Sequence, residues 1–371
     1  MYGSYEMTAR VTSILPPALL AAYHLSADET TRQLTGSLAP DERFPVASVT
    51  KTLVALLAAR LCEDGVLAWD ERLGALLGHT AGVPMELDAA HWGSVALTER
   101  ELADAVARPP RLPLPPGTWH YSNLGYAIAA RLLERAAGQP FPALLANRLL
   151  RPLGMTRTSL PDARSEGPLA LGAAAAPAGD LWSTLKDLMT LAHALDGRRP
   201  DVVSRPMLAL LLKGAIPDGD GVHYGAGIRT HAVGPHRVLV AIGHIGDRRT
   251  CVTVWPRRGA SVLVASAECD RDALWRAGAQ RWRRDDATAR TWWWDGQQVR
   301  EVRHGDAVEL LLGETTWPFP LLSGRADGSA LVGVDWRGEL LELRDEGDAL
   351  TGPGLRLTAD AGDSAATDVD W

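Results

Sequence analysis

A serine and a lysine in the first part of the chain have the spacing that nucleophilic catalysis requires. Ser48-Val49-Thr50-Lys51 stands at the predicted start of an apolar helix over residues 48–62. A spacing of three places the hydroxyl and the amine on one face of that helix, one turn apart. A lysine desolvated in an apolar helix end can have its pKa lowered enough to take the serine proton, and the free amides of the helix N-terminus can stabilise an oxyanion. The pattern predicts acyl transfer through a covalent acyl-Ser48 intermediate.

Lysine is otherwise rare in this sequence. Of the 38 basic residues only three are lysine, at positions 51, 186 and 213. Because arginine does not readily give up its proton, a lysine that persists in a buried helix favours a chemical role. A second S-x-x-K copy runs from Ser183 to Lys186. An amphipathic helix pattern follows it, capped by Ser183 or Thr184, and we interpret Ser183 as an N-cap and Lys186 as solvated.

The second candidate motif is Tyr121-Ser122-Asn123, the only Y-x-N in the chain, which enters a predicted helix after a proline-rich segment. A tyrosine near a lysine ammonium can shuttle a proton between the nucleophile and the leaving group. The asparagine amide can hold both the lysine and a substrate carbonyl. A helix cap would explain Asn123 equally well from the sequence.

The third candidate motif is His244-Ile245-Gly246-Asp247, at the end of a predicted strand over residues 238–242. A glycine there lets the backbone approach a ligand closely, and the amide of the next residue could supply a second oxyanion donor. A lone histidine in a strand is more often structural, so this motif by itself is weak.

Hydrophobic periodicity predicts the elements that must position these residues. Short apolar runs separated by glycine and charge predict an antiparallel sheet, and longer periodic runs predict helices that flank it. The predicted strands cover residues 19–27, 31–38, 238–242, 251–255 and 262–266, and the predicted helices cover residues 48–62, 98–107, 121–138, 183–195 and 271–284. After about residue 286, short β-like pieces at turn spacing predict a separate small β domain. We therefore expect an α/β (α+β) domain over residues 1–285 and a β-rich domain over residues 286–371.

Composition narrows the class of protein. The chain has 371 residues, 46% of them hydrophobic and 22% charged, with a net charge of −7. A chain without a basic stripe is not expected to bind nucleic acid. Cys62, Cys251 and Cys269 lie far apart without C-x-x-C spacing, which argues against a disulfide framework and a zinc site. Neither a signal peptide nor a membrane span is evident near the start, so we expect a cytoplasmic protein with no membrane partner. The oligomeric state stays open.

Four longer stretches accompany the three motifs: GHTAGVP at 78–84, PPGTWHYSNLGYAIAARLLERAAGQPF at 115–141, LLRPLGMTRT at 149–158 and AAPAGDLWSTLKDL at 175–188. In this order they resemble the class C β-lactamase and DD-peptidase family of serine hydrolases. The resemblance covers about residues 18–285 and implies a serine β-lactamase or penicillin-binding-protein-like fold. The part of the chain beyond it looks lipocalin-like. No metal or organic cofactor is implied.

The resemblance also implies roles for single residues. Ser48 would be the acylated nucleophile, Lys51 its base, Tyr121 the proton shuttle and Asn123 a contact for lysine and substrate. His244 stands where β-lactamases usually carry lysine, and the amides of Ser48 and Asp247 would form the oxyanion hole.

Two departures from the family pattern affect the expected substrate. The chain is short before its first predicted hairpin, and the H-x-G is followed by Asp247-Arg248-Arg249-Thr250 in place of the usual glycines. An acidic side chain where β-lactam carboxylates dock is electrostatically unfavourable for that ligand. We therefore do not expect β-lactamase activity, and we hypothesise a neutral or amine-bearing small-molecule or peptide acyl substrate.

Several functions stay open at this level. The first is a hydrolase that acts on esters or amides, including those of D-amino acids. The second is a transacylase or peptide cyclase similar to the penicillin-binding-protein-type thioesterases of natural-product pathways. A third is a scaffold that binds a ligand without turnover, and a fourth places ligand binding in the C-terminal domain.

Overall fold

The computed structural model describes residues 19–359 except 30–31, 88–96, 163, 165, 167–170, 220, 284–286, 295–296, 305–306, 313–319, 328–329, 336–339, 348 and 353–354. The chain divides into two compact units. The first lies within residues 1–230 and 239–282, and the second within residues 231–238 and 283–371. Segment 231–238 is grouped with the second unit, where the Pro235 carbonyl accepts a hydrogen bond of 3.1 Å from Arg300.

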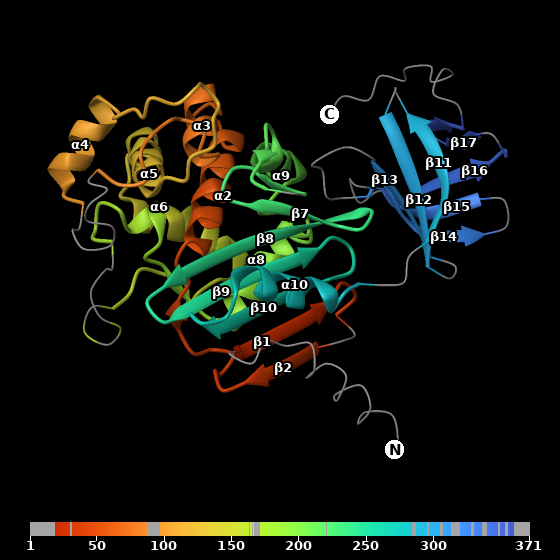
Figure 1. Cartoon of the computed structure of the whole chain (residues 1–371), viewed down its shortest axis with the longest axis horizontal. Helices are drawn as coiled ribbons and strands as arrows, with labels where there is room; N and C mark the ends of the chain where they lie inside the picture. Colours follow the sequence, from red (N-terminus) through yellow and green to blue (C-terminus); the bar gives the residue numbers. More distant parts are fainter. Residues whose placement is uncertain are drawn as a thin grey trace. The chain divides into compact units, whose positions relative to one another are not determined.

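The first unit is built on one eight-stranded sheet with the order β2-β1-β10-β9-β8-β7-β6-β5 (Figure 1). Its strands are β1 (Leu19–Ser26), β2 (Arg32–Gly36), β5 (Ile216–Pro217), β6 (Val222–Tyr224), β7 (Arg229–Val233), β8 (His236–Ile245), β9 (Arg248–Trp255) and β10 (Gly259–Ser266). The central strands β9 and β10 are rich in β-branched residues and buried along nearly their whole length, as expected for strands covered on both faces. The strands predicted at 238–242, 251–255 and 262–266 lie within β8, β9 and β10.

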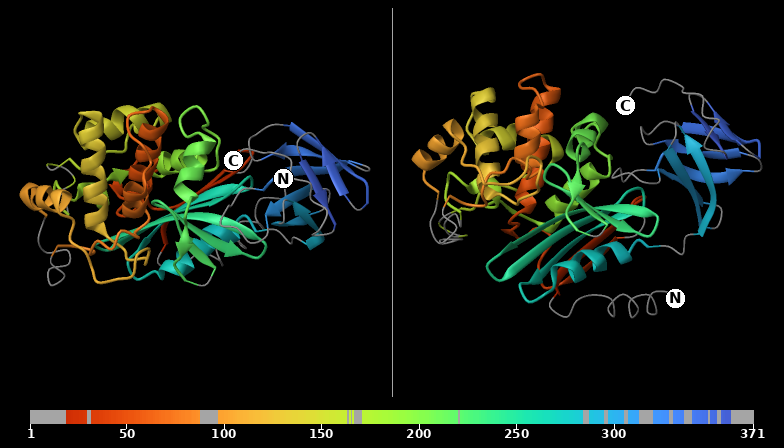
Figure 2. Two further views of the ribbon diagram at one scale, coloured as in Figure 1. Left: turned by 90° about the horizontal axis from the view of Figure 1, so that it is seen from above. Right: turned by 45° about the horizontal axis from the view of Figure 1, so that its top comes forward.

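Helices cover both faces of this sheet. They are α2 (Val49–Glu63), α3 (Glu71–Leu77), α4 (Glu99–Ala107), α5 (Asn123–Ala137), α6 (Phe141–Leu145), α7 (Arg151–Leu153), α8 (Leu185–Leu195), α9 (Arg205–Leu212) and α10 (Arg271–Gln280), with a π-helical turn η2 (Ala146–Leu150) and a 3-10 turn η3 (Ala176–Ala178). Helices α8 and α10 both pack on β9 and β10. Figure 2 shows α10 on the face of the sheet opposite α2 and α5. A short ribbon of β3 (Phe44–Pro45) and β4 (Trp182–Ser183) leads into α2 and α8.

Helix α2 runs through the middle of the first unit. Twelve of its fifteen residues are buried, and it packs against α5, α6, α9 and both short turns. A helix that is apolar on all sides is stable only when other elements surround it, so the sequence places α2 inside the core. Its N-terminus points toward β8, which brings the chemistry-bearing residues of distant segments together (Figure 1).

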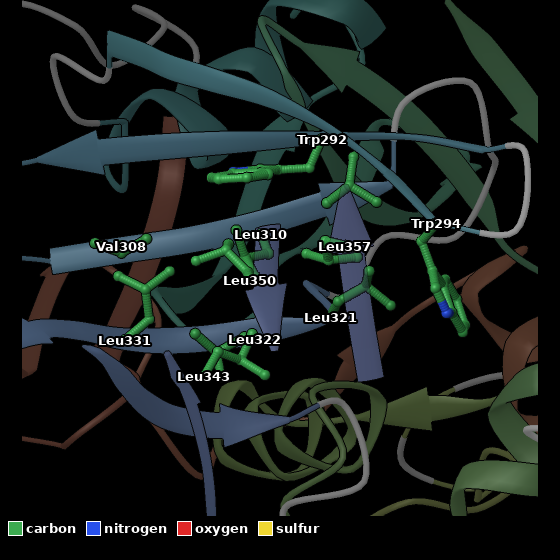
Figure 3. Packing of buried hydrophobic residues seen from close by; sticks show 11 residues of the cluster. Trp292, Trp294, Val308, Leu310, Leu321, Leu322, Leu331, Leu343, Leu350 and Leu357 are labelled. Atoms are coloured by element: carbon green, nitrogen blue, oxygen red, sulfur yellow. The ribbon is translucent and has the colours of Figure 1, made fainter. Parts of the chain in front are cut away.

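The second unit is a closed barrel of eight antiparallel strands in chain order, with β18 returning to β11. The strands are β11 (Ala287–Trp294), β12 (Gln297–His304), β13 (Ala307–Leu312), β14 (Leu322–Asp327), β15 (Ala330–Asp335), β16 (Leu340–Asp345), β17 (Ala349–Gly352) and β18 (Leu355–Thr358). Alternate residues point inward, and buried side chains that include Trp292, Leu310 and Leu350 fill the interior (Figure 3). The prediction of a small β domain is confirmed, and closure leaves its strands without an open edge.

Of the two residues predicted as caps of the helix over residues 183–195, Ser183 was wrong and Thr184 was right. Ser183 lies in β4 and is fully buried, with its hydroxyl 2.7 Å from that of Thr158. Thr184 caps α8 instead, because its side chain accepts a hydrogen bond from the Asp187 amide. Lys186 is solvated as predicted and pairs with a surface aspartate. Among the described helices, none combines the length and the apolar character that a membrane crossing needs.

Candidate active site

Ser48 occupies the N-cap position of α2, but its side chain makes no capping bond. The hydroxyl is therefore available to other groups, and its oxygen lies 2.6 Å from the Tyr121 hydroxyl and 3.2 Å from the Lys51 amine. The preceding residue, Ala47, has φ +47°, a left-handed conformation that is uncommon for alanine. Such local strain is typical of residues that present a functional group.

Lys51 is 1% exposed, and its amine contacts three oxygen acceptors. Nζ lies 2.7 Å from Asn123 Oδ1, 2.6 Å from the Ala178 carbonyl oxygen and 3.2 Å from Ser48 Oγ. A neutral amine has two N–H donors and one lone pair, so donation to Asn123 and Ala178 directs the lone pair toward the serine. Burial lowers the pKa of Lys51 below its usual 10.5, against the opposing effect of Tyr121. The geometry and the electrostatics both suit a general base.

The three side chains of the Tyr121-Ser122-Asn123 segment make different contacts. Ser122 caps α5, with its hydroxyl accepting from the Gly125 amide at 2.7 Å. Asn123 is therefore not the cap of α5, which was the alternative that the sequence left open. It accepts from Lys51 and donates to Glu86 Oε1 at 2.7 Å. The tyrosine ring also lies under the lysine, with Nζ 4.7 Å from the ring centroid.

Sequence reasoning missed Glu86. Its half-buried carboxylate accepts from Asn123, and desolvation raises its pKa while the Asn123 hydrogen bond opposes the rise. Glu86 belongs to no motif and precedes segment 88–96, which lies outside the described residues. Glu86 reaches the site because its loop contacts Asn123 at the start of α5.

The H-x-G segment lies across the end of β8 and the turn that follows. His244 is exposed, with Nε2 3.1 Å from the Gly246 carbonyl oxygen. Gly246 has φ +56° in the turn, and a Cβ added there would meet nothing within 4 Å. Asp247 is exposed in the same turn, and its carbonyl accepts from the Ala267 amide.

Gly243 is the glycine that approaches Ser48. A Cβ at this position would lie 2.3 Å from the Val46 carbonyl oxygen and 2.7 Å from the Ser48 nitrogen. The backbone of β8 therefore reaches the start of α2 only because residue 243 has no side chain. The structure places Gly243, three residues before Gly246, in the position of close approach.

Two cavities meet at Ser48, and both are lined by Tyr121 and His244. The first has a volume of about 290 Å³ and carries basic side chains from three elements, namely Arg229, Arg249 and Arg271. None of the described residues that line it is acidic. The second has a volume of about 360 Å³ and is lined mainly by small and apolar residues, together with Glu86 and Asn123.

The two sides of Ser48 therefore differ in charge. Arg229 is neutralised by Asp218 at 2.7 Å. Arg249 donates its Nε to the Ala267 carbonyl, and Arg271 approaches Asp272 only at 3.5 Å. Asp247 lines neither of these two cavities. The reason for expecting a neutral or amine-bearing substrate was an acidic side chain facing the ligand, and this reason does not apply to the arginine-lined cavity.

The comparison with protein families agrees with this geometry. The family model for beta-lactamase matches residues 18–283, which is most of the chain. The chain belongs to the beta-lactamase family. The family consists of serine hydrolases, and its matched range includes every site residue named above. No group of three or more histidine, cysteine or acidic residues able to hold a metal ion occurs among the described residues.

Individual relatives in the family are distant. Unguisins hydrolase ungD' of Aspergillus campestris is 27% identical over 216 residues, which cover 45% of this chain and 40% of that protein. The crystal structure of SurE with D-Leu has a TM-score of 0.60 at 21% identity and covers 95% of this chain and 98% of that one. A D-stereospecific amidohydrolase from Streptomyces sp. has a TM-score of 0.60 at 20% identity, with 73% and 98% covered. At these identities the structural likeness concerns the fold.

Proposed function

We propose that this protein is an acyl-enzyme hydrolase that cleaves amide or ester bonds through acyl-Ser48, with a D-amino acid residue on the acyl side of its substrate. The arrangement of Ser48, Lys51, Tyr121 and Asn123 carries the proposal, because each member contacts another at hydrogen-bond distance. A protein that only binds a ligand would not need a buried lysine directed at a serine. The D-configuration is supported by the D-stereospecific amidohydrolase that shares the fold.

The contacts lead to a two-step reaction. Ser48 Oγ attacks the substrate carbonyl while its proton passes to the neutral Lys51 Nζ. The Ser48 amide and a backbone amide of β8 beside Gly243 would hold the oxyanion. Tyr121 then donates its hydroxyl proton to the leaving amine or alcohol and regains one from the Lys51 ammonium, which restores both groups, and water deacylates Ser48 by the same proton transfers.

The charge on the two sides of Ser48 points to the substrate. Arg249 and Arg271 suit a carboxylate or another anionic group in the first cavity. Within the described part of the chain, each arginine keeps N–H groups that are available to a ligand. The Glu86 side suits an amino group on the acyl portion. The preferred substrate is therefore a zwitterionic peptide or amide rather than a neutral ester.

A fluorophosphonate probe followed by intact-protein mass spectrometry tests the nucleophile. We expect one adduct on the wild type and on Ser183→Ala, and none on Ser48→Ala. Ser183 is a matched control because it stands in the same S-x-x-K pattern but is fully buried against Thr158. An unlabelled wild type would favour the binding-scaffold interpretation.

Substrate preference is tested with D- and L-aminoacyl p-nitroanilides, each with and without a carboxylate on the leaving group. We expect the D-series to react faster, and the carboxylate to increase kcat/KM in the wild type but not in Arg249→Gln. Equal rates for both enantiomers would contradict the proposed substrate class.

Transfer to an acceptor other than water is the second candidate function. The observation that favours it is the pair of cavities at Ser48, since one can hold the acyl group while the other admits an amine. Addition of a free D-amino acid to the hydrolysis assay would then divert product to a new amide, which liquid chromatography detects. Hydrolysis alone at high acceptor concentration would exclude this candidate.

A further inference from the structure

A buried histidine that the proposed reaction does not use packs against Tyr121. His79 is 2% exposed, and it follows α3 in a loop remote from Tyr121 in sequence. Its φ of +61° is left-handed, which is uncommon for histidine. A strained, buried and polar residue beside a reactive side chain calls for a physical reason.

His79 makes hydrogen bonds on both sides of Tyr121. Its carbonyl oxygen accepts from the His120 amide at 2.8 Å. Its ring nitrogen Nδ1 accepts from the Ser122 amide at 3.1 Å. One residue thereby fixes the backbone immediately before and immediately after Tyr121.

The His79 ring also packs against the Tyr121 ring. The two centroids are 4.5 Å apart with an interplanar angle of 42°. Tyr224 and Tyr126 also contact the histidine ring, at centroid distances of 4.8 and 5.2 Å. The Tyr121 ring is therefore packed against a buried aromatic cluster, while its hydroxyl lies 2.6 Å from Ser48 Oγ.

These contacts require a neutral imidazole. Because Nδ1 accepts a hydrogen bond, the ring proton resides on Nε2. Burial, followed by the charge of Lys51, holds the pKa of His79 well below its usual 6.5. A neutral histidine can accept from Ser122 without adding a cation beside Lys51.

We propose that His79 is a positioning residue for acyl transfer, and that its Nδ1 acceptor clamps the Tyr121 backbone so that the phenol stays on Ser48. The inference rests on the acyl-transfer function proposed above. A shift of the phenol by about 1 Å would cost on the order of 10²-fold in rate.

The test compares His79→Asn with His79→Gly. Both residues tolerate a left-handed φ and both remove the imidazole ring, but only asparagine keeps an acceptor near the position of Nδ1. We expect His79→Gly to lower kcat for a chromogenic ester by about 10²-fold with KM little changed, and His79→Asn to stay within about tenfold of the wild type. His24→Asn is the control for loss of a buried histidine elsewhere, since His24 bonds Ser261 in the sheet. It should lower Tm and leave kcat unchanged.

Each outcome decides the inference. Equal kcat for His79→Gly and the wild type, or equal loss in the glycine and asparagine variants, would overturn the clamp. If the glycine variant does not fold, an asparagine variant that folds but has lost 10²-fold in kcat would overturn it as well. Failure of the acyl-transfer function itself is distinguishable, because the wild type would then carry no fluorophosphonate adduct at Ser48.

Discussion

Substitution of Gly243 by alanine tests whether the close approach of β8 to Ser48 is needed for the proposed acyl transfer. The new Cβ would lie 2.3 Å from the Val46 carbonyl oxygen, 2.7 Å from the Ser48 nitrogen and 2.9 Å from the Ala47 Cβ. Two of these three atoms are backbone, so no side-chain rotation relieves the overlap. The strand and the start of α2 must therefore move apart.

The size of the movement follows from these distances. Real Cβ contacts do not fall below 3.0 Å, so the shortest contact must lengthen by about 0.7 Å, the difference between 3.0 and 2.3 Å. Overpacking of this kind costs about 1–3 kcal/mol of stability. Loss of one oxyanion donor costs about 10²–10³-fold in kcat. We expect Gly243→Ala to stay folded but to lose activity on that scale.

The assay is the rate of fluorophosphonate labelling at Ser48, together with kcat for an ester and Tm for stability. Gly36→Ala is the control for overlap elsewhere in the sheet, because its Cβ would lie 2.2 Å from the Leu20 carbonyl oxygen and its φ of +106° adds backbone strain, far from Ser48. The control should lose stability and keep its labelling rate. Wild-type labelling by Gly243→Ala would refute the assignment of β8 to the oxyanion site.

Four further predictions follow from contacts in the first unit. Tyr121→Phe should lower kcat by about 10²–10⁴-fold without loss of fold, as expected when a proton-transfer group is removed, and ester kinetics with circular dichroism check this. The acylation rate should rise with pH as Lys51 loses its proton, with an inflection below 10.5, because burial lowers its pKa. In Glu86→Gln the inflection should move to lower pH, since the Glu86 charge raises the pKa of Lys51; an unchanged pH profile would contradict this. Thr184→Ala should cost about 1 kcal/mol in chemical denaturation through loss of the α8 cap, with labelling of Ser48 unchanged.

The sequence by itself determined the parts of the site that depend on local geometry. Ser48 and Lys51 are three residues apart at the start of a helix, and helix geometry places them together wherever that helix packs. The same holds for Asn123, which is two residues from Tyr121 at the start of α5. Short apolar runs bounded by turn residues were also sufficient for five of the eight sheet strands and for the small β domain, because strand length and turn signals are local, whereas β5, β6 and β7 were not predicted.

Only the tertiary structure decided which distant residues meet at Ser48. Gly243 and not Gly246 touches α2, because the register of β8 against the helix depends on packing across the whole sheet. Glu86 reaches the site through a hydrogen bond between its loop and Asn123. Arg271 comes from α10, which packs on the face of the sheet opposite α2. Such contacts join segments separated by tens to hundreds of residues, and no spacing in the chain encodes them. The proximity of Ser48 and Lys51 therefore follows from local sequence, whereas the other residues around Ser48 are brought there by long-range packing.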